Sequence, residues 1–101
     1  MKRIIKGKMY NTETAKRIGS QGNGLGRSDF RYINEELYQK KTGEFFLAGE
    51  GGALTKYADV SEYGRDFGSG IVPLTEDAAR EWVEEYMSVS TYIKLFGEPE
   101  E

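Results

Sequence analysis

The chain has 101 residues, enough for one domain with a single modest hydrophobic core. Its seven Tyr, five Phe and one Trp indicate a core built from aromatic rings. The absence of Cys excludes disulfides, thiolate nucleophiles and Cys-ligated zinc, and the absence of His excludes the usual general base near neutral pH and the usual metal ligand. Any catalysis would therefore depend on carboxylates, Lys, Tyr or a hard metal ion bound by carboxylates.

The net charge of −3 is unevenly distributed along the chain. Residues 1–42 hold ten Lys or Arg and four Asp or Glu, a charge of +6, whereas residues 43–101 hold four and thirteen, a charge of −9. A basic side would attract phosphates, and an acidic side would attract basic grooves. The alternative is a solvated surface on which the fold mixes the two signs again.

The chain contains no run of about 18 apolar residues, so we expect no membrane-spanning helix. Residues 1–10 include basic side chains but no apolar core segment, so we also expect no signal peptide. These features predict an intracellular protein.

The N-terminal third predicts short elements joined by a loop. Residues 1–10 predict a strand or a short hairpin bent at Lys6-Gly7. Residues 11–19 predict a helix of about two turns, with Asn11 or Thr12 as N-cap and Gly19 at its end. Residues 20–28 predict a flexible loop, because their three glycines lack the Gly-Lys-Ser/Thr ending of a phosphate-binding loop. Residues 28–35 fit no single period and predict either a strand or a helical turn.

Residues 36–52 predict a β-hairpin at the centre of the fold. Gly43 supplies the positive φ that a two-residue turn at Thr42-Gly43 requires. If Lys41 faces Glu44, strand alternation gives two apolar faces, one with Tyr38, Phe45 and Leu47 and the other with Leu37 and Phe46. A strand that is apolar on both faces is usually central and covered on both sides.

The segment that follows is rich in glycine. The glycines around Glu50 predict a sharp bend in which this carboxylate accepts backbone N–H groups. Residues 53–58 then predict another strand, and residues 59–70 predict a polar, mobile loop. Residues 71–74 predict a short edge strand, because Pro73 cannot donate a ladder hydrogen bond.

The C-terminal third predicts two helices. The first begins after its N-cap Thr75, with Leu74 placed to pack on the first turns. Its buried stripe recurs at helical spacing and consists of Ala79, Trp82, Val83 and Tyr86. A second, shorter helix is expected to have Ser90 as its cap and to end at Gly97, and the last four residues are expected to fray.

Together these elements predict an α+β fold in which residues 1–101 form a single domain. We expect a small antiparallel sheet of about four or five strands with the central hairpin in its middle, packed by the C-terminal amphipathic helix plus short helices. The core is expected to bring together Tyr38, Phe45, Leu47, Trp82 and Tyr86.

The charged residues support three interpretations. Glu81, Glu84 and Glu85 include i,i+3 and i,i+4 pairs that can share a metal ion or a proton, although a solvated helix face is the simpler interpretation.

Contact with nucleic acid is suggested by basic residues that alternate with Phe30 and Tyr32, namely Lys2, Lys6, Lys8, Arg27, Arg31, Lys40 and Lys41. The pI of about 5.1 argues against a dedicated nucleic-acid-binding domain. Imitation of phosphates in a basic groove is suggested by the helical carboxylates Glu76, Asp77, Glu81, Glu84 and Glu85.

Three segments carry a resemblance to a known group of proteins. They are IIKGKMYNTETA in residues 4–15, SDFRYINEELYQKKTGEFFLAGEGG in residues 28–52 and IVPLTEDAAREWVEEY in residues 71–86, and the most specific parts are residues 10–15 and 41–46. The chain resembles small proteins of plasmids, phages and other mobile elements of Gram-positive bacteria, among which type II anti-CRISPR proteins have been described. The resemblance implies an inhibitor of an RNA-guided DNA nuclease that acts in the cytoplasm of a bacterial host.

We therefore hypothesise a non-enzymatic binding protein whose partners are a CRISPR effector nuclease and its guide RNA. We predict no catalytic residue, metal ion or cofactor. The alternatives are a nucleic-acid-binding or guide-RNA-processing protein that acts through Glu and Lys, and a mobile-element protein with an unrelated partner. The predicted partner-binding residues are Glu76, Asp77, Glu81, Glu84, Glu85, Lys40, Lys41, Arg27 and Arg31.

Overall fold

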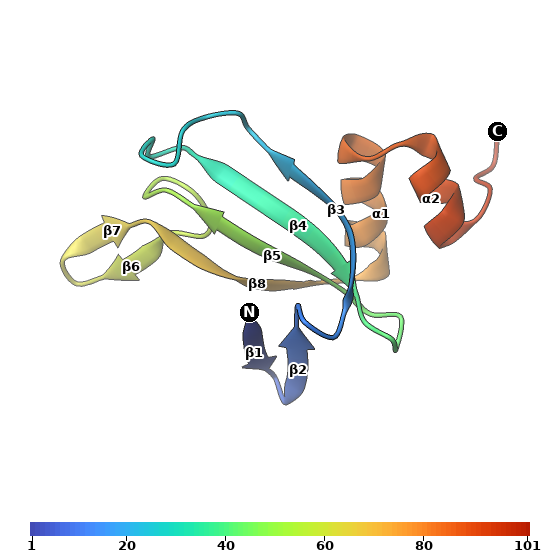
Figure 1. Cartoon of the computed structure of the whole chain (residues 1–101), viewed down its shortest axis with the longest axis horizontal. Coiled ribbons are helices and arrows are strands. Elements are labelled where there is room, and N and C mark those ends of the chain that lie inside the picture. Colours follow the sequence, from blue (N-terminus) through green and yellow to red (C-terminus); the bar gives the residue numbers. More distant parts are fainter.

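The computed structural model describes residues 1–101 and has the predicted α+β class (Figure 1). A four-stranded antiparallel sheet has the strand order β3-β4-β5-β8. Its strands are β3 (Lys16–Gly22), β4 (Ile33–Gln39), β5 (Phe45–Gly51) and β8 (Gly68–Leu74). The other elements are the hairpins β1 (Lys2–Ile5) with β2 (Lys8–Asn11) and β6 (Asp59–Ser61) with β7 (Gly64–Asp66), and the helices α1 (Glu76–Tyr86) and α2 (Val89–Phe96).

The sheet is covered on both faces, so β4 and β5 are central strands as predicted. On one face α1 packs Ala79, Trp82 and Val83 against the sheet. On the other face the β1–β2 hairpin packs Tyr10 against Phe46, with the two rings 5.5 Å apart and nearly perpendicular. Burial from both sides explains why β5 reads as a nearly continuous apolar run.

The predicted register of the central hairpin is wrong by one residue. Five residues, 40–44, connect the strands, and Gln39 pairs with Phe45. The connection is closed by a 2.8 Å hydrogen bond from the Lys40 N–H to the Glu44 carbonyl, with Gly43 at φ +96°. Because side chains alternate along a strand, the longer turn moves every side chain of β4 to the other face relative to β5.

This register divides the expected core into two. Leu37, in place of Tyr38, joins Phe45 and Leu47 under α1. Tyr38 stacks on Phe46 on the opposite face, with ring centroids 5.3 Å apart, and does not meet Trp82.

Two segments take a different structure from the predicted one. Residues 11–19 form a single turn, in which Asn11 Oδ1 accepts the Glu13 N–H, and then enter β3. A two-turn helix is marginal by itself, and the backbone bonds of β3 to β4 replace it. Residues 53–58 form turns instead of a strand, whereas the predicted loop of residues 59–70 forms the β6–β7 hairpin and the start of β8.

The edge strand and the two helices largely follow the prediction. β8 is an edge strand and contains Pro73. Thr75 caps α1, since its Oγ1 accepts the Ala78 N–H at 3.1 Å, but Tyr86 is 41 % exposed and lies at the border of the buried stripe. Ser88, and not Ser90, caps α2, which ends at Gly97 with φ +88°. Neither helix is long and apolar enough to cross a membrane.

We expect Phe46→Ala to reduce the free energy of unfolding by about 3–5 kcal/mol, because the fully buried ring contacts both Tyr10 and Tyr38. Urea denaturation followed by tryptophan fluorescence measures this change. Phe30→Ala is the matched control, since Phe30 is exposed, and it should change the free energy by no more than about 0.5 kcal/mol. Equal effects of the two substitutions would contradict the placement of Phe46 in the core.

Candidate functional site

The outer side of α1 carries five exposed carboxylates, which we call the acidic face: Glu76, Asp77, Glu81, Glu84 and Glu85. The only cation on the helix, Arg80, lies 3.5 Å from Glu76. The other four carboxylates make no ion pair within the chain. The structure thus brings all five of the predicted acidic residues onto one rigid element.

The acidic face lowers the stability of the helix that carries it. Glu76 and Asp77 lie in the first turn, where they complement the helix dipole, but Glu84 and Glu85 lie near the C-terminal end, where negative charge is unfavourable. No basic residue occupies the last turn. Like charges at i,i+4 spacing, such as Glu81 and Glu85, oppose the helix further. Burial and the charge of Glu85 raise the pKa of Tyr86, the last residue of the helix.

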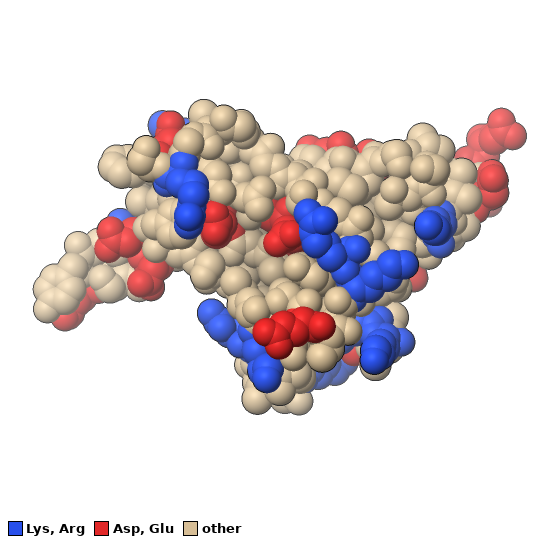
Figure 2. Space-filling view, viewed as in Figure 1, with Lys and Arg blue, Asp and Glu red and all other residues tan.

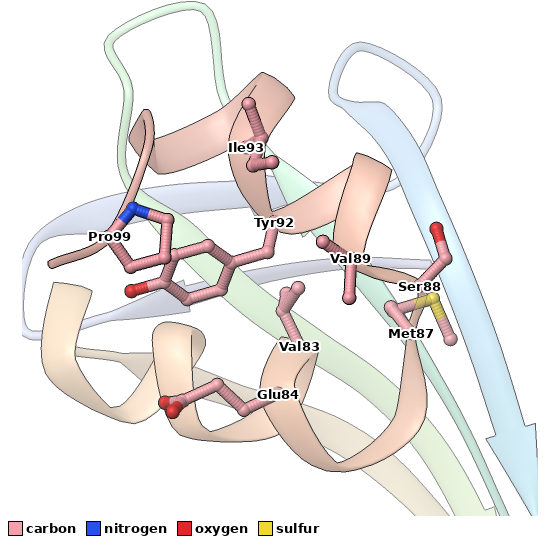
Figure 3. A pocket seen from close by; sticks show the side chains of 8 residues that line it. All are labelled: Val83, Glu84, Met87, Ser88, Val89, Tyr92, Ile93 and Pro99. Atoms are coloured by element: carbon pink, nitrogen blue, oxygen red, sulfur yellow. The ribbon is translucent and has the colours of Figure 1, made fainter. Parts of the chain in front are cut away.

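Negative charge continues beyond the helix, where the C-terminal segment adds the exposed residues Glu98, Glu100 and Glu101. Figure 2 shows acidic side chains at the C-terminal end of the molecule. Between α1 and α2 lies an apolar hollow of about 240 Å³ (Figure 3), lined by Val83, Glu84, Met87, Ser88, Val89, Tyr92, Ile93 and Pro99. The acidic face therefore borders an apolar surface that the C-terminal segment partly covers.

The predicted basic residues do not form one surface. Arg27 and Arg31 precede β4, whereas Lys40 and Lys41 follow it, and a seven-residue strand separates the two pairs by about 20 Å. Lys40 is 15 % exposed, with Nζ 3.8 Å from the centroid of the Tyr10 ring and 3.7 Å from a Glu44 oxygen. Its ammonium group therefore has a structural role within the domain.

Arg27 is likewise engaged within the chain. Its Nε lies 3.3 Å from Glu50, and its guanidinium lies over the ring of Phe67 at 4.9 Å. Glu50 also accepts the Tyr32 hydroxyl at 2.7 Å, so it binds side chains and not the backbone N–H groups expected of it. Of the four predicted basic residues, only Arg31 and Lys41 make no side-chain ion pair.

A second group of cations lies where α2 approaches the sheet. Lys16, Arg17 and Lys94 line a hollow of about 280 Å³ together with Gln39 and Thr91. Arg17 is paired with Glu36, whereas Lys16 and Lys94 have no acidic partner. Figure 2 shows basic side chains gathered near the start of β3. The sequence did not indicate this group, because Lys94 is distant from Lys16 in the chain.

Sequence reasoning also missed a buried carboxylate, Glu35, which is 3 % exposed in the middle of β4. Its Oε1 accepts the Gln21 amide at 2.8 Å and the Trp82 indole N–H at 3.3 Å. Its Oε2 accepts the Tyr57 hydroxyl at 2.7 Å and lies 2.6 Å from the Lys56 ammonium. The donors come from β3, α1 and the turn after β5, so this single carboxylate joins three elements.

The contacts of Glu35 determine its ionisation. Burial alone would raise the pKa of Glu35, but the hydrogen bonds from Lys56, Tyr57, Gln21 and Trp82 outweigh burial, and the pKa lies below its ordinary value of 4.5. Burial of the Tyr57 hydroxyl and its bond to Glu35 raise the pKa of Tyr57. Glu35 is buried, and its donors occupy both oxygens. We therefore interpret this cluster as a structural one.

A signal for the buried cluster exists in the sequence, in the glycine opposite Glu35. Gly49 pairs with Glu35 across the β4–β5 ladder, and a Cβ at this position would overlap the ring of Tyr57. The glycine therefore serves close packing within a strand, and not the sharp bend that we predicted.

No group of three His, Cys, Asp or Glu side chains lies close enough together to hold a metal ion. Comparisons of the chain with models of protein families, with curated proteins and with solved structures find no match.

We expect Glu35→Gln to lower the free energy of unfolding by about 1–3 kcal/mol, because the amide keeps the volume but turns one acceptor into a donor that faces other donors. Glu36→Gln is the matched control on the same strand, and it should cost less than about 1 kcal/mol because its pair with Arg17 is solvent-accessible. Urea denaturation at pH 7 measures both. A smaller loss at position 35 than at position 36 would contradict the assigned role.

The same carboxylate predicts a pH dependence of stability. Because the pKa of Glu35 is lower in the folded chain than in the unfolded chain, its contribution is complete above about pH 4.5 and is lost as the pH falls through the folded value. The difference in unfolding free energy between the wild type and Glu35→Gln should therefore be constant above this pH and shrink below it. Denaturation at a series of pH values tests this, and parallel profiles throughout the acid range would contradict it.

Proposed function

We propose that the chain is a non-enzymatic binding protein that inhibits a bacterial RNA-guided DNA nuclease in the host cytoplasm. The observation that carries this proposal is the acidic face, in which four of five exposed carboxylates have no cationic partner in the chain. Such an arrangement lowers helix stability and is not compensated inside the domain. A cationic groove on a partner would compensate it.

The geometry of the acidic face suits a groove that normally holds nucleic acid. Asp77, Glu81 and Glu85 follow one another at i,i+4 spacing, about 6 Å apart along the helix axis. Carboxylates held at regular intervals on a rigid helix would displace the counterions of a cationic groove as phosphates do. The buried stripe of α1 fixes the helix on the sheet, so little conformational entropy would be lost on binding.

The class of target comes from the resemblance of residues 4–15, 28–52 and 71–86 to type II anti-CRISPR proteins. Residues 71–86 include the whole of α1, and residues 28–52 include the central hairpin that supports it. The resemblance therefore covers both the acidic face and its scaffold. An RNA-guided nuclease offers long cationic channels for its RNA and DNA, which are the kind of groove that the acidic face would fit.

A second candidate function is contact with the guide RNA. The hollow lined by Lys16, Arg17 and Lys94 favours it, because two of these cations have no acidic partner. Among the basic residues predicted from the sequence, however, Lys40 and Arg27 are engaged with Tyr10 and Glu50. We therefore place RNA contact second.

The proposal predicts that changing Glu81, Glu84 and Glu85 together to Lys abolishes inhibition while the domain stays folded, because all three side chains are exposed. DNA cleavage by a guide-loaded type II nuclease, titrated with the wild type and the variant, measures inhibition. Circular dichroism and urea denaturation measure folding. A variant with Gln at the three positions should lose part of the inhibition, in proportion to the charge removed.

The matched control for this experiment changes Glu98, Glu100 and Glu101 to Lys, which alters the net charge by the same amount outside the helix. This control should retain inhibition. Full inhibition by the folded helix variant would refute a role for the acidic face. Equal loss in both variants would show that net charge alone, and not the helix, is responsible.

A further inference from the structure

The β6–β7 hairpin, which we call the arm (residues 59–66), projects from the end of the sheet opposite the helices (Figure 1). Every residue of β6 and β7 is exposed, so neither face of the hairpin is covered. Its tip is Glu62-Tyr63, followed by Gly64 at φ +126°. Tyr63 is 92 % exposed, more than any other large apolar or aromatic residue of the chain. The arm thus presents an uncovered aromatic side chain at the far end of an elongated molecule.

The base of the arm is held in place by side chains from other segments. Arg65 donates from Nε to the Ala53 carbonyl at 2.6 Å and from Nη2 to the Thr55 carbonyl at 3.2 Å. Phe67, directly after the arm, lies under the guanidinium of Arg27 and stacks on Tyr32 at 6.2 Å. These contacts fix the direction of the arm before any partner binds, which lowers the entropy lost on association.

Exposed large hydrophobic residues gather around the arm. We call this region the distal end: residues 23–32, 52–58 and the arm with Phe67, which meet where β3 and β5 end and where β4 and β8 begin. Six of the eleven exposed large hydrophobic residues lie here, namely Leu25, Phe30, Leu54, Val60, Tyr63 and Phe67. Aromatic residues and Arg are the types enriched in protein–protein interfaces, and this region also holds Arg27 and Arg31.

The charge of the arm limits the kind of partner that it fits. Asp59, Glu62 and Asp66 are exposed and form no ion pair in the chain. The one cation of the arm, Arg65, is turned back to the two carbonyls at its base. The projecting surface is therefore negative with an aromatic tip, which opposes contact with phosphates and favours a protein cleft lined by cations.

We infer that the arm inserts Tyr63 into a cation-lined cleft of the partner protein, as a second contact separate from the acidic face. This inference rests on the proposed function, in which the partner is an RNA-guided nuclease with cationic clefts for nucleic acid. The narrow hairpin supplies the shape, its carboxylates supply the charge complementarity, and the tyrosine supplies the buried anchor.

The first test measures the affinity of purified full-length variants for a guide-loaded type II nuclease in a binding titration. Tyr63→Ala and Glu62→Lys should each weaken binding at least about tenfold, as expected for a central aromatic anchor and its neighbouring charge. Val89→Ala is the matched control, because Val89 is 76 % exposed and lies in α2, far from the arm. Wild-type affinity in both arm variants would overturn the inference while leaving the proposed function intact.

The second test separates failure of the inference from failure of the proposed function. A photo-crosslinking amino acid replaces Tyr63, or Val89 as control, and crosslinks formed in a Gram-positive lysate are mapped by mass spectrometry. Adducts specific to position 63 in a cation-lined cleft of the nuclease support both proposals. Adducts in such a cleft of a different nucleic-acid-binding protein support the role of the arm and overturn the nuclease as target. Adducts to RNA, or none beyond those of position 89, overturn the role of the arm.

Discussion

The buried carboxylate of Glu35 is the constraint on which the arrangement of the other elements depends. A charge at this depth is tolerated only when its oxygens are fully hydrogen-bonded, so all of its donors must be in place together. Those donors come from β3, from α1 and from the turn after β5. The position of α1 on the sheet, and with it the direction of the acidic face, is therefore coupled to the position of that turn.

The contacts of Glu35 are connected to the base of the arm. Tyr57, which donates to Glu35, fills the space left by Gly49, and its carbonyl lies so close to Gly68 that a side chain there would collide with it. The turn that carries Tyr57 also offers the carbonyls of Ala53 and Thr55 to Arg65. A contiguous set of contacts thus connects the buried charge to the base of the arm. This explains how a hairpin with no buried residue of its own keeps a defined direction.

The sequence allowed prediction of elements whose determinants are local. Thr75, the acidic first turn and the apolar stripe predict α1, and Pro73 predicts an edge strand, because caps and periodicity act within a few residues. Local signals do not predict the structure of segments that is decided by pairing with distant strands. Asn11 Oδ1 accepts the Glu13 N–H within a single turn, but no helix follows for it to cap, because β3 pairs with β4. The register of the β4–β5 hairpin depends on its five-residue turn. In this turn the Lys40 ammonium contacts the ring of Tyr10, and the sequence of the hairpin alone does not predict that contact.

The candidate sites divide in the same way. The acidic face was predictable because its carboxylates fall outside the apolar stripe of α1. The sheet topology, in contrast, decides that Lys16 lies near Lys94 and that Arg27 lies far from Lys41. Glu35 was missed because a carboxylate is assumed to be exposed, and its donors at positions 21, 56, 57 and 82 are brought together only by the fold.

Buried and exposed carboxylates differ in their pairing within this domain. The buried carboxylate Glu35 is fully paired, whereas the carboxylates of the acidic face and of the arm are exposed and mostly unpaired. The acidic face and the arm lie toward opposite ends of a molecule with extents of 48 × 32 × 20 Å (Figure 1). A partner that engaged both would need cationic surface along most of the longest dimension. A channel for nucleic acid has that extent and charge, whereas a compact small-molecule pocket has neither.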